Sequence, residues 1–163
     1  SLSCHEPALW GLLEADPAFR VIAICGENPA LYERLAPIEA LAGGRLVRLG
    51  FTDRVADILA ASDLLVTKPG PGSLSEAFHQ RVPVVVTRNL HTIPQERFNT
   101  DFVRDRGLGL VVPHWREITA AVLRLFRDPA AGAALRDRIA ALPPNRAVFE
   151  VIDLIAREAS ARR

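Results

Sequence analysis

The chain has 163 residues, of which 49% are hydrophobic and 24% charged, and its formal net charge is +1. This length suits a single domain with a core of two or three layers, and the near-neutral charge excludes an acidic tail protein and gives no support for nucleic-acid binding. Cys4 and Cys25 are too few for a disulfide framework or a four-cysteine zinc site. The longest apolar runs fall well short of the ~20 residues that span a bilayer. We therefore expect a reduced, cytoplasmic protein.

Short β-branched runs alternate with stretches of helical periodicity along most of the chain. The runs predict buried strands at 20–25, 45–49, 64–67, 82–87 and 108–112. The periodic stretches predict helices at 6–15, 30–41, 54–61, 73–80, 94–105, 114–126, 129–142 and 146–159. This alternation is typical of βαβ units, so we predict an α/β fold: one Rossmann-like domain over 1–163, with a doubly wound parallel sheet and C-terminal helices.

The start of the chain departs from the usual order of such a sheet, because a helix precedes the first strand. The chain also contains no methionine, even at position 1. We interpret it as a fragment that lacks the first strand, and we expect its neighbours to have an unpaired edge. Such an edge and an apolar cleft wall could pair two copies, so a homodimer of the fragment is one expectation.

The strongest local pattern is the segment 66–77, VTKPGPGSLSEA, between a predicted strand and a predicted helix. Gly70 and Gly72 allow a tight turn, and the helix beginning at Ser73 offers unpaired amides and the positive end of its dipole. This arrangement suits a phosphate or diphosphate, whose charge Lys68 would partly neutralise. Lys68 is the only lysine among 20 basic residues, which indicates either a need for a compact ammonium at this position or a chance retention.

A structural explanation fits the same residues. Ser73 and Glu76 have the spacing of a capping box, in which the serine caps the helix and the glutamate bonds back to the cap residue. In that interpretation the glycines only form the turn. The spacing alone leaves both explanations open.

Three further segments follow predicted strands at the same edge of the sheet. Gln95 and Glu96 lie in the first helical turn after Pro94, where they would either bind several hydroxyls or form a polar surface turn. The segment 25–28 contains Cys25, which we interpret as a small buried residue. Either the backbone of Phe51 and Thr52 would contact the edge of a planar base, or Phe51 would belong to the core. No histidine or carboxylate spacing indicates a metal site, and no cofactor is expected.

On the segments 21–35, 46–77 and 82–99 the chain resembles the C-terminal half of glycosyltransferase family 28. It is most similar to the processive diacylglycerol glucosyltransferases and monogalactosyldiacylglycerol synthases. The resemblance implies a GT-B fold, in which this half binds a UDP-sugar and a missing N-terminal half binds a lipid acceptor. It also implies an inverting, metal-independent hexosyltransferase, peripheral at the inner face of the membrane, of which this fragment alone would be inactive.

The resemblance also implies roles for individual residues, while the catalytic base stays unassigned. Those near the diphosphate are Lys68, Gly70, Pro71, Gly72 and Ser73. Those near the rest of the donor are Glu76 at the ribose, Gln95 and Glu96 at the sugar with Asn99 in support, Phe51 and Thr52 at the uracil, and the loop from Gly26 to Asn28 at the cleft. Two alternatives stay open: a non-catalytic donor-binding subunit that acts with a separate acceptor-binding protein, and a Rossmann-like interaction domain.

Overall fold

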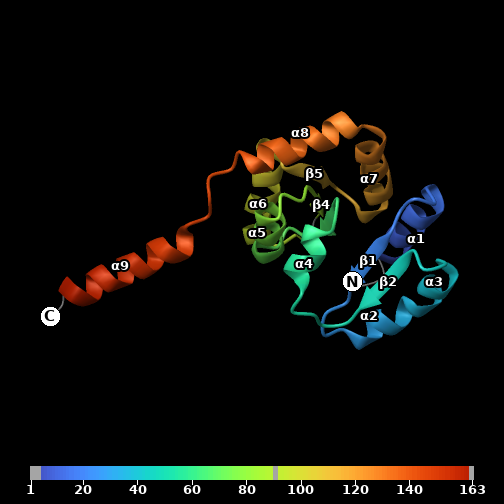
Figure 1. Cartoon of the computed structure of the whole chain (residues 1–163), viewed down its shortest axis with the longest axis horizontal. Helices are drawn as coiled ribbons and strands as arrows, with labels where there is room; N and C mark the ends of the chain where they lie inside the picture. The colour runs from blue at the N-terminus through green and yellow to red at the C-terminus, as the bar shows by residue number, and fades with distance from the viewer. Residues whose placement is uncertain (1–4, 90–91, 162–163) are drawn as a thin grey trace.

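The computed structural model describes residues 5–89 and 92–161, which form strands and helices in alternation (Figure 1). The strands are β1 Val21–Ile24, β2 Leu46–Leu49, β3 Leu65–Thr67, β4 Val84–Thr87 and β5 Gly109–Val112. The helices are α1 His5–Ala15, α2 Pro29–Arg34, α3 Ala36–Leu41, α4 Val55–Ala60, α5 Pro71–His79, α6 Pro94–Asp105, the 3-10 helix η2 Trp115–Glu117, α7 Ile118–Arg127, α8 Pro129–Ala140 and α9 Ala147–Ala161. All five predicted strands are present, and the α/β fold class is confirmed.

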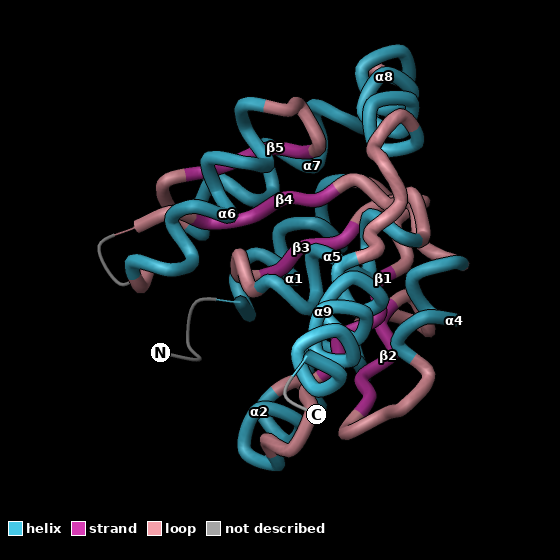
Figure 2. The backbone as a smooth tube through the Cα atoms, turned by 90° about the vertical axis from the view of Figure 1, so that its left-hand side faces the viewer, coloured by secondary structure: helices cyan, strands magenta, loops and turns pink. Residues whose placement is uncertain are grey.

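The described strands are divided between two parallel sheets. β1 pairs with β2, and β4 lies between β3 and β5 in the other sheet. Figure 2 shows β3, β4 and β5 side by side. Within the described part of the chain, β1, β2, β3 and β5 each pair with one neighbour, and the loss of a first strand stays a prediction.

The three-stranded sheet is covered on both faces. Val84, Val85 and Val86 of β4 are each 0% exposed. Val85 packs in a cluster with residues of α1, α7 and α8, whereas Val84 and Val86 pack in a second cluster with residues of α5 and α6. A parallel strand with helices on both faces needs apolar side chains in both directions, which explains the unbroken valine run.

The two-stranded sheet is covered on one face. Leu46 packs there with Leu13 of α1, and Val21 and Ala23 lie against the same cluster. Ile22 and Val47, which are register partners and therefore share a face, are each 46% exposed. Because Ala8 and Leu12 of α1 belong to the cluster around Val85, α1 contacts the cores of both sheets.

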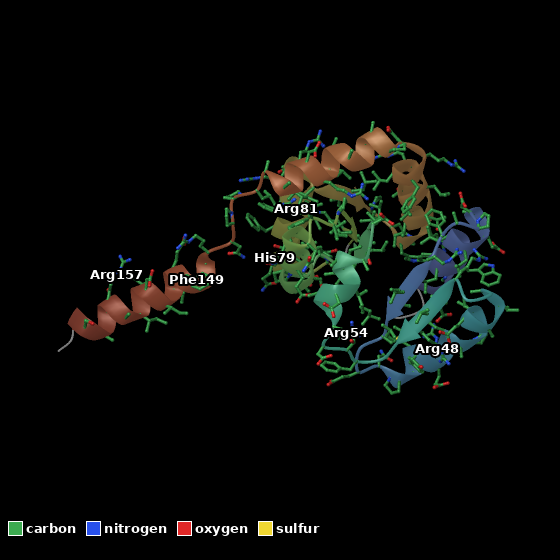
Figure 3. All side chains as sticks on the ribbon, in the orientation of Figure 1. Arg48, Arg54, His79, Arg81, Phe149 and Arg157 are labelled. Atoms are coloured by element: carbon green, nitrogen blue, oxygen red, sulfur yellow. The ribbon has the colours of Figure 1, made fainter. Side chains whose placement is uncertain are left out.

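Arg48 of β2 links α2 and α3 to the two-stranded sheet through hydrogen bonds (Figure 3). Its guanidinium donates hydrogen bonds to the Tyr32 carbonyl (2.6 Å) and to the Glu39 carboxylate (2.7 Å), and its amide donates to the other oxygen of Glu39 (2.9 Å). The amide bond is the main cause of the lowered pKa of Glu39, and the guanidinium bond adds to it.

Two helices differ from the prediction. The segment expected as one helix over 30–41 is two, α2 and α3, because Pro37 lacks an amide hydrogen and cannot continue the hydrogen bonds of α2. The segment 114–126 likewise divides into η2 and α7.

After the prolines at 143–144, α9 extends away from the other elements, and Phe149 on it is 64% exposed (Figures 1 and 3). Among the described residues, no helix combines the length and the apolar character needed to span a membrane.

Candidate functional site

The turn between β3 and α5 lies at the carboxyl edge of the three-stranded sheet. α5 begins at Pro71 rather than at the predicted Ser73, because proline at the first helical position has its φ angle already set and loses no hydrogen bond there. Gly70 is the N-cap residue, with φ −70° and ψ 137°, and no side chain caps the helix. The capping-box explanation is therefore wrong: Ser73 is the third helical residue, and Glu76 lies in the second turn.

The uncapped start of α5 leaves backbone donors exposed. Pro71 has no amide hydrogen, so the amides of Gly72 and Ser73 are the first that α5 offers without a partner inside the helix. The Leu74 amide, one residue further, already donates to the Gly70 carbonyl at 3.2 Å. Pro71 and Gly72 are exposed, and an added Cβ on Gly72 would meet no atom within 4 Å. Open space therefore lies beside Gly72, at the start of α5.

The start of α6 contacts this turn. Lys68 Nζ lies 3.7 Å from Glu96 Oε1, and the side chains of Lys68 and Glu96 are 77% and 15% exposed. Asn99 Nδ2 donates a hydrogen bond to the Pro69 carbonyl at 2.8 Å. Pro94 is at the first turn of α6, as predicted, and Gln95 is exposed beside it. The ammonium, the two amides and the α6 side chains thus form one surface.

A charged cluster at the same edge was not anticipated from the sequence. Arg88, which directly follows β4, pairs with Asp101 of α6, and Arg104 also bonds to Asp101. Burial by itself would raise the pKa of Asp101, but the hydrogen bonds from Arg88 and Arg104 outweigh it and lower that pKa. The position of Arg88 immediately after a strand is the signal that could have found this cluster. Leu90 and His91, in the same loop, lie outside the described residues.

The remaining predicted residues lie in the loops that follow β1 and β2, the strands of the two-stranded sheet. The side chain of Asn28 accepts a hydrogen bond from the Leu31 amide (2.9 Å) and caps α2. Thr52 Oγ1 accepts one from the Arg54 amide (3.1 Å), and Phe51 is 74% exposed. Gly26 adopts a left-handed conformation with φ 57°, which favours glycine. Among the described residues, no hydrogen bond or ion pair links these positions to the surface formed by α5 and α6.

Cys25 has the structural environment that the sequence indicated. Its side chain is buried, and burial raises the pKa of the thiol. The positive charge of Arg48 lowers this pKa, but by less than burial raises it. A protonated, buried thiol is a poor nucleophile. Cys4 lies outside the described residues. Within the described ranges, no three histidine, cysteine, aspartate or glutamate side chains are grouped so that they could hold a metal ion.

Known proteins with similar sequences and folds are glycosyltransferases. No protein-family model matches the chain. It is 37% identical over 117 residues to the processive diacylglycerol beta-glucosyltransferase of Bacillus subtilis (strain 168), which covers 71% of this chain and 30% of that protein. It is 28% identical over 119 residues to the probable chloroplastic monogalactosyldiacylglycerol synthase of Nicotiana tabacum, covering 73% of this chain and 22% of that protein. The chain therefore spans less than a third of these relatives.

Solved structures show the same fold. WaaG, a glycosyltransferase involved in lipopolysaccharide biosynthesis, superposes with a TM-score of 0.64 at 19% identity, over 85% of this chain and 38% of that one. SsfS6, a glycosyltransferase of Streptomyces sp. SF2575, superposes with a TM-score of 0.54, also at 19% identity, over 88% of this chain and 42% of that one. At these identities the likeness establishes the Rossmann-like fold of GT-B glycosyltransferases and no more.

Proposed function

Because this chain is a homologue of the processive diacylglycerol glucosyltransferases and monogalactosyldiacylglycerol synthases of glycosyltransferase family 28, we propose that it is the donor-binding part of a UDP-dependent hexosyltransferase. The acceptor is a diacylglycerol-type lipid, held by a domain beyond this chain at the cytoplasmic face of the membrane. The observation that carries the proposal is the uncapped start of α5, with Lys68 beside it, at the carboxyl edge of a parallel sheet.

The amides of Gly72 and Ser73 bind the diphosphate of the donor. They point out of the amino end of α5, where the helix dipole favours negative charge. The exposed ammonium of Lys68 reaches the same region and neutralises one phosphate oxygen. These groups supply positive charge to the diphosphate, so the proposed transfer needs no metal ion.

Glu76, Gln95 and Glu96 bind the hydroxyls of the donor. Glu76 is exposed and stands four residues after Gly72 and three after Ser73, so the three share one face of α5. It binds the ribose, and Gln95 and Glu96 bind the transferred sugar. Phe51 and Thr52, together with the loop from Gly26 to Asn28, flank the uracil from the neighbouring sheet.

The reaction is an inverting transfer. The oxygen of an acceptor hydroxyl forms a bond to the anomeric carbon while the bond from that carbon to the diphosphate oxygen breaks and leaves its electron pair on UDP. The hydroxyl proton goes to a base outside the assigned residues. Negative charge grows on the leaving diphosphate, where preorganised amides, the dipole of α5 and Lys68 stabilise it.

Calorimetric titration of the chain with UDP tests this proposal. We expect saturable binding by the unaltered chain and at least about tenfold weaker binding by Gly72→Val, because the added side chain occupies space beside the amides, where an added Cβ meets no other atom. Gly132→Val is the matched control: it places the same side chain in α8, where an added Cβ makes only ordinary contacts. Absence of saturable binding by the unaltered chain, or equal binding by Gly72→Val, would contradict the proposal.

A further inference from the structure

The peptide unit between Pro69 and Gly70 is held at both of its polar ends. The Pro69 carbonyl accepts a hydrogen bond from Asn99 Nδ2 at 2.8 Å, a contact between residues 30 positions apart in the sequence. The Gly70 amide donates to the Lys68 carbonyl at 2.7 Å. Because a peptide unit is planar, these two bonds fix the direction of the whole plane.

This fixed plane leads directly into α5. Gly70 is the N-cap residue of α5, and the ring of Pro71 restricts the next φ angle. The orientation of the Pro69–Gly70 plane therefore carries over to the amides of Gly72 and Ser73 through the backbone angles of Gly70 (φ −70°, ψ 137°) and the restricted φ of Pro71. Pro69 and Gly70 are buried, so water cannot readily replace the Asn99 bond.

We propose that Asn99 is a positioning residue that aims the amides of Gly72 and Ser73 at the donor diphosphate. This inference rests on the proposed function and adds to it a role carried through the protein backbone. Asparagine suits the position because its amide is an uncharged donor. Aspartate would set a second acceptor against the Pro69 carbonyl and a negative charge near the phosphates, and alanine would leave the carbonyl without this partner.

The experiment compares UDP with uridine, which lacks the diphosphate, on the unaltered chain and on Asn99→Ala. We expect Asn99→Ala to bind UDP about three- to tenfold more weakly, the range that corresponds to one lost hydrogen bond, and to bind uridine unchanged. In the ligand-free protein, the backbone amide resonances of Gly72 and Ser73 should shift in the variant. The matched control is Ser62→Ala, since the Ser62 hydroxyl also donates to a backbone carbonyl, that of Ile58 at 2.6 Å, near the opposite end of β3. Ser62→Ala should bind both ligands as the unaltered chain does.

The outcomes separate the positioning role from a general structural one. Equal UDP binding by Asn99→Ala and the unaltered chain would overturn the inference and leave the proposed function standing. Loss of UDP and uridine binding together, or a similar loss in Ser62→Ala, would also overturn it, because general destabilisation does not distinguish the two ligands. Failure of the unaltered chain to bind UDP would contradict the proposed function itself.

Discussion

The two sheets differ in how completely they are covered. In the three-stranded sheet, helices pack on both faces of β4, and its valines at 84–86 have no exposed surface. In the two-stranded sheet one face packs on α1 and α3, while Ile22, Ile24 and Val47 on the other are between 41% and 46% exposed. The apolar content of the strands is similar, so the difference lies in what covers them.

This difference explains why the candidate site is best formed on the three-stranded sheet. The turn before α5 follows a strand of that sheet, and α6 braces it through Asn99 and Glu96. The loops after β1 and β2 form local hydrogen bonds, since Asn28 caps α2 and Thr52 Oγ1 accepts from the Arg54 amide, and Phe51 in the loop between β2 and α4 is exposed. The proposed diphosphate site needs donors held in fixed directions, which the helices packed on both faces of β4 favour.

Truncating one valine in each sheet should give the largest change in the free energy of unfolding. The two variants directly compare how completely the two sheets are covered. Val84→Ala removes buried methyl groups from a covered strand, and we expect it to lower the free energy of unfolding by about 2 kcal/mol or more. Val47→Ala makes the same change at a side chain that is 46% exposed, and should cost under about 1 kcal/mol. Urea unfolding of both variants provides the measurement. Equal losses would show that the open face of the two-stranded sheet is covered in solution.

Removing the charge of Glu96 should have a smaller effect, on binding. In the ligand-free protein Glu96 pairs with Lys68, so it competes with a phosphate for that ammonium. Glu96→Gln should therefore bind UDP about two- to fivefold more tightly, as expected for the loss of a partly exposed ion pair. Calorimetry with UDP, which lacks the transferred sugar that we propose Glu96 binds, isolates this effect.

Asp63→Asn is the control for Glu96→Gln. Asp63 pairs with Arg136 at 3.5 Å, at the opposite end of β3, so its loss should leave UDP affinity unchanged. Weaker UDP binding by Glu96→Gln would show that the carboxylate supports the diphosphate site instead of competing with it.

The smallest expected effect is a loss of stability in acid, when Glu39 beside the two-stranded sheet becomes protonated. The hydrogen bonds from Arg48 hold the pKa of folded Glu39 below its ordinary value of 4.5. A carboxyl whose pKa is lower in the folded state stabilises the fold above the unfolded pKa and loses this contribution as the pH falls through the folded pKa. Between pH 6 and pH 3 the unaltered chain should therefore lose more stability than Glu39→Gln, which has no carboxyl to protonate. Urea unfolding at each pH measures the stability of both proteins. An equal loss of stability in the unaltered chain and in Glu39→Gln would contradict this expectation.

The sequence predicted local features well and long-range contacts poorly. The five strands and Pro94 at the start of α6 follow from apolar runs and from the fixed φ of proline, both of which act over a few residues. The start of α5 was placed at Ser73 because the capping-box spacing competes with the preference of Pro71 for the first helical position, and the spacing could not decide between them. The division into two sheets and the Asn99–Pro69 bond depend on pairings between distant segments, which no local pattern encodes.

The most direct test of the central claim follows the backbone amides of α5 by NMR during titration with UDP and, separately, with uridine. If the start of α5 binds the diphosphate, the amide resonances of Gly72 and Ser73 should move strongly and saturably with UDP and remain in place with uridine. If both ligands move them equally, or if UDP moves only residues elsewhere, the diphosphate does not bind at this helix and the account is contradicted.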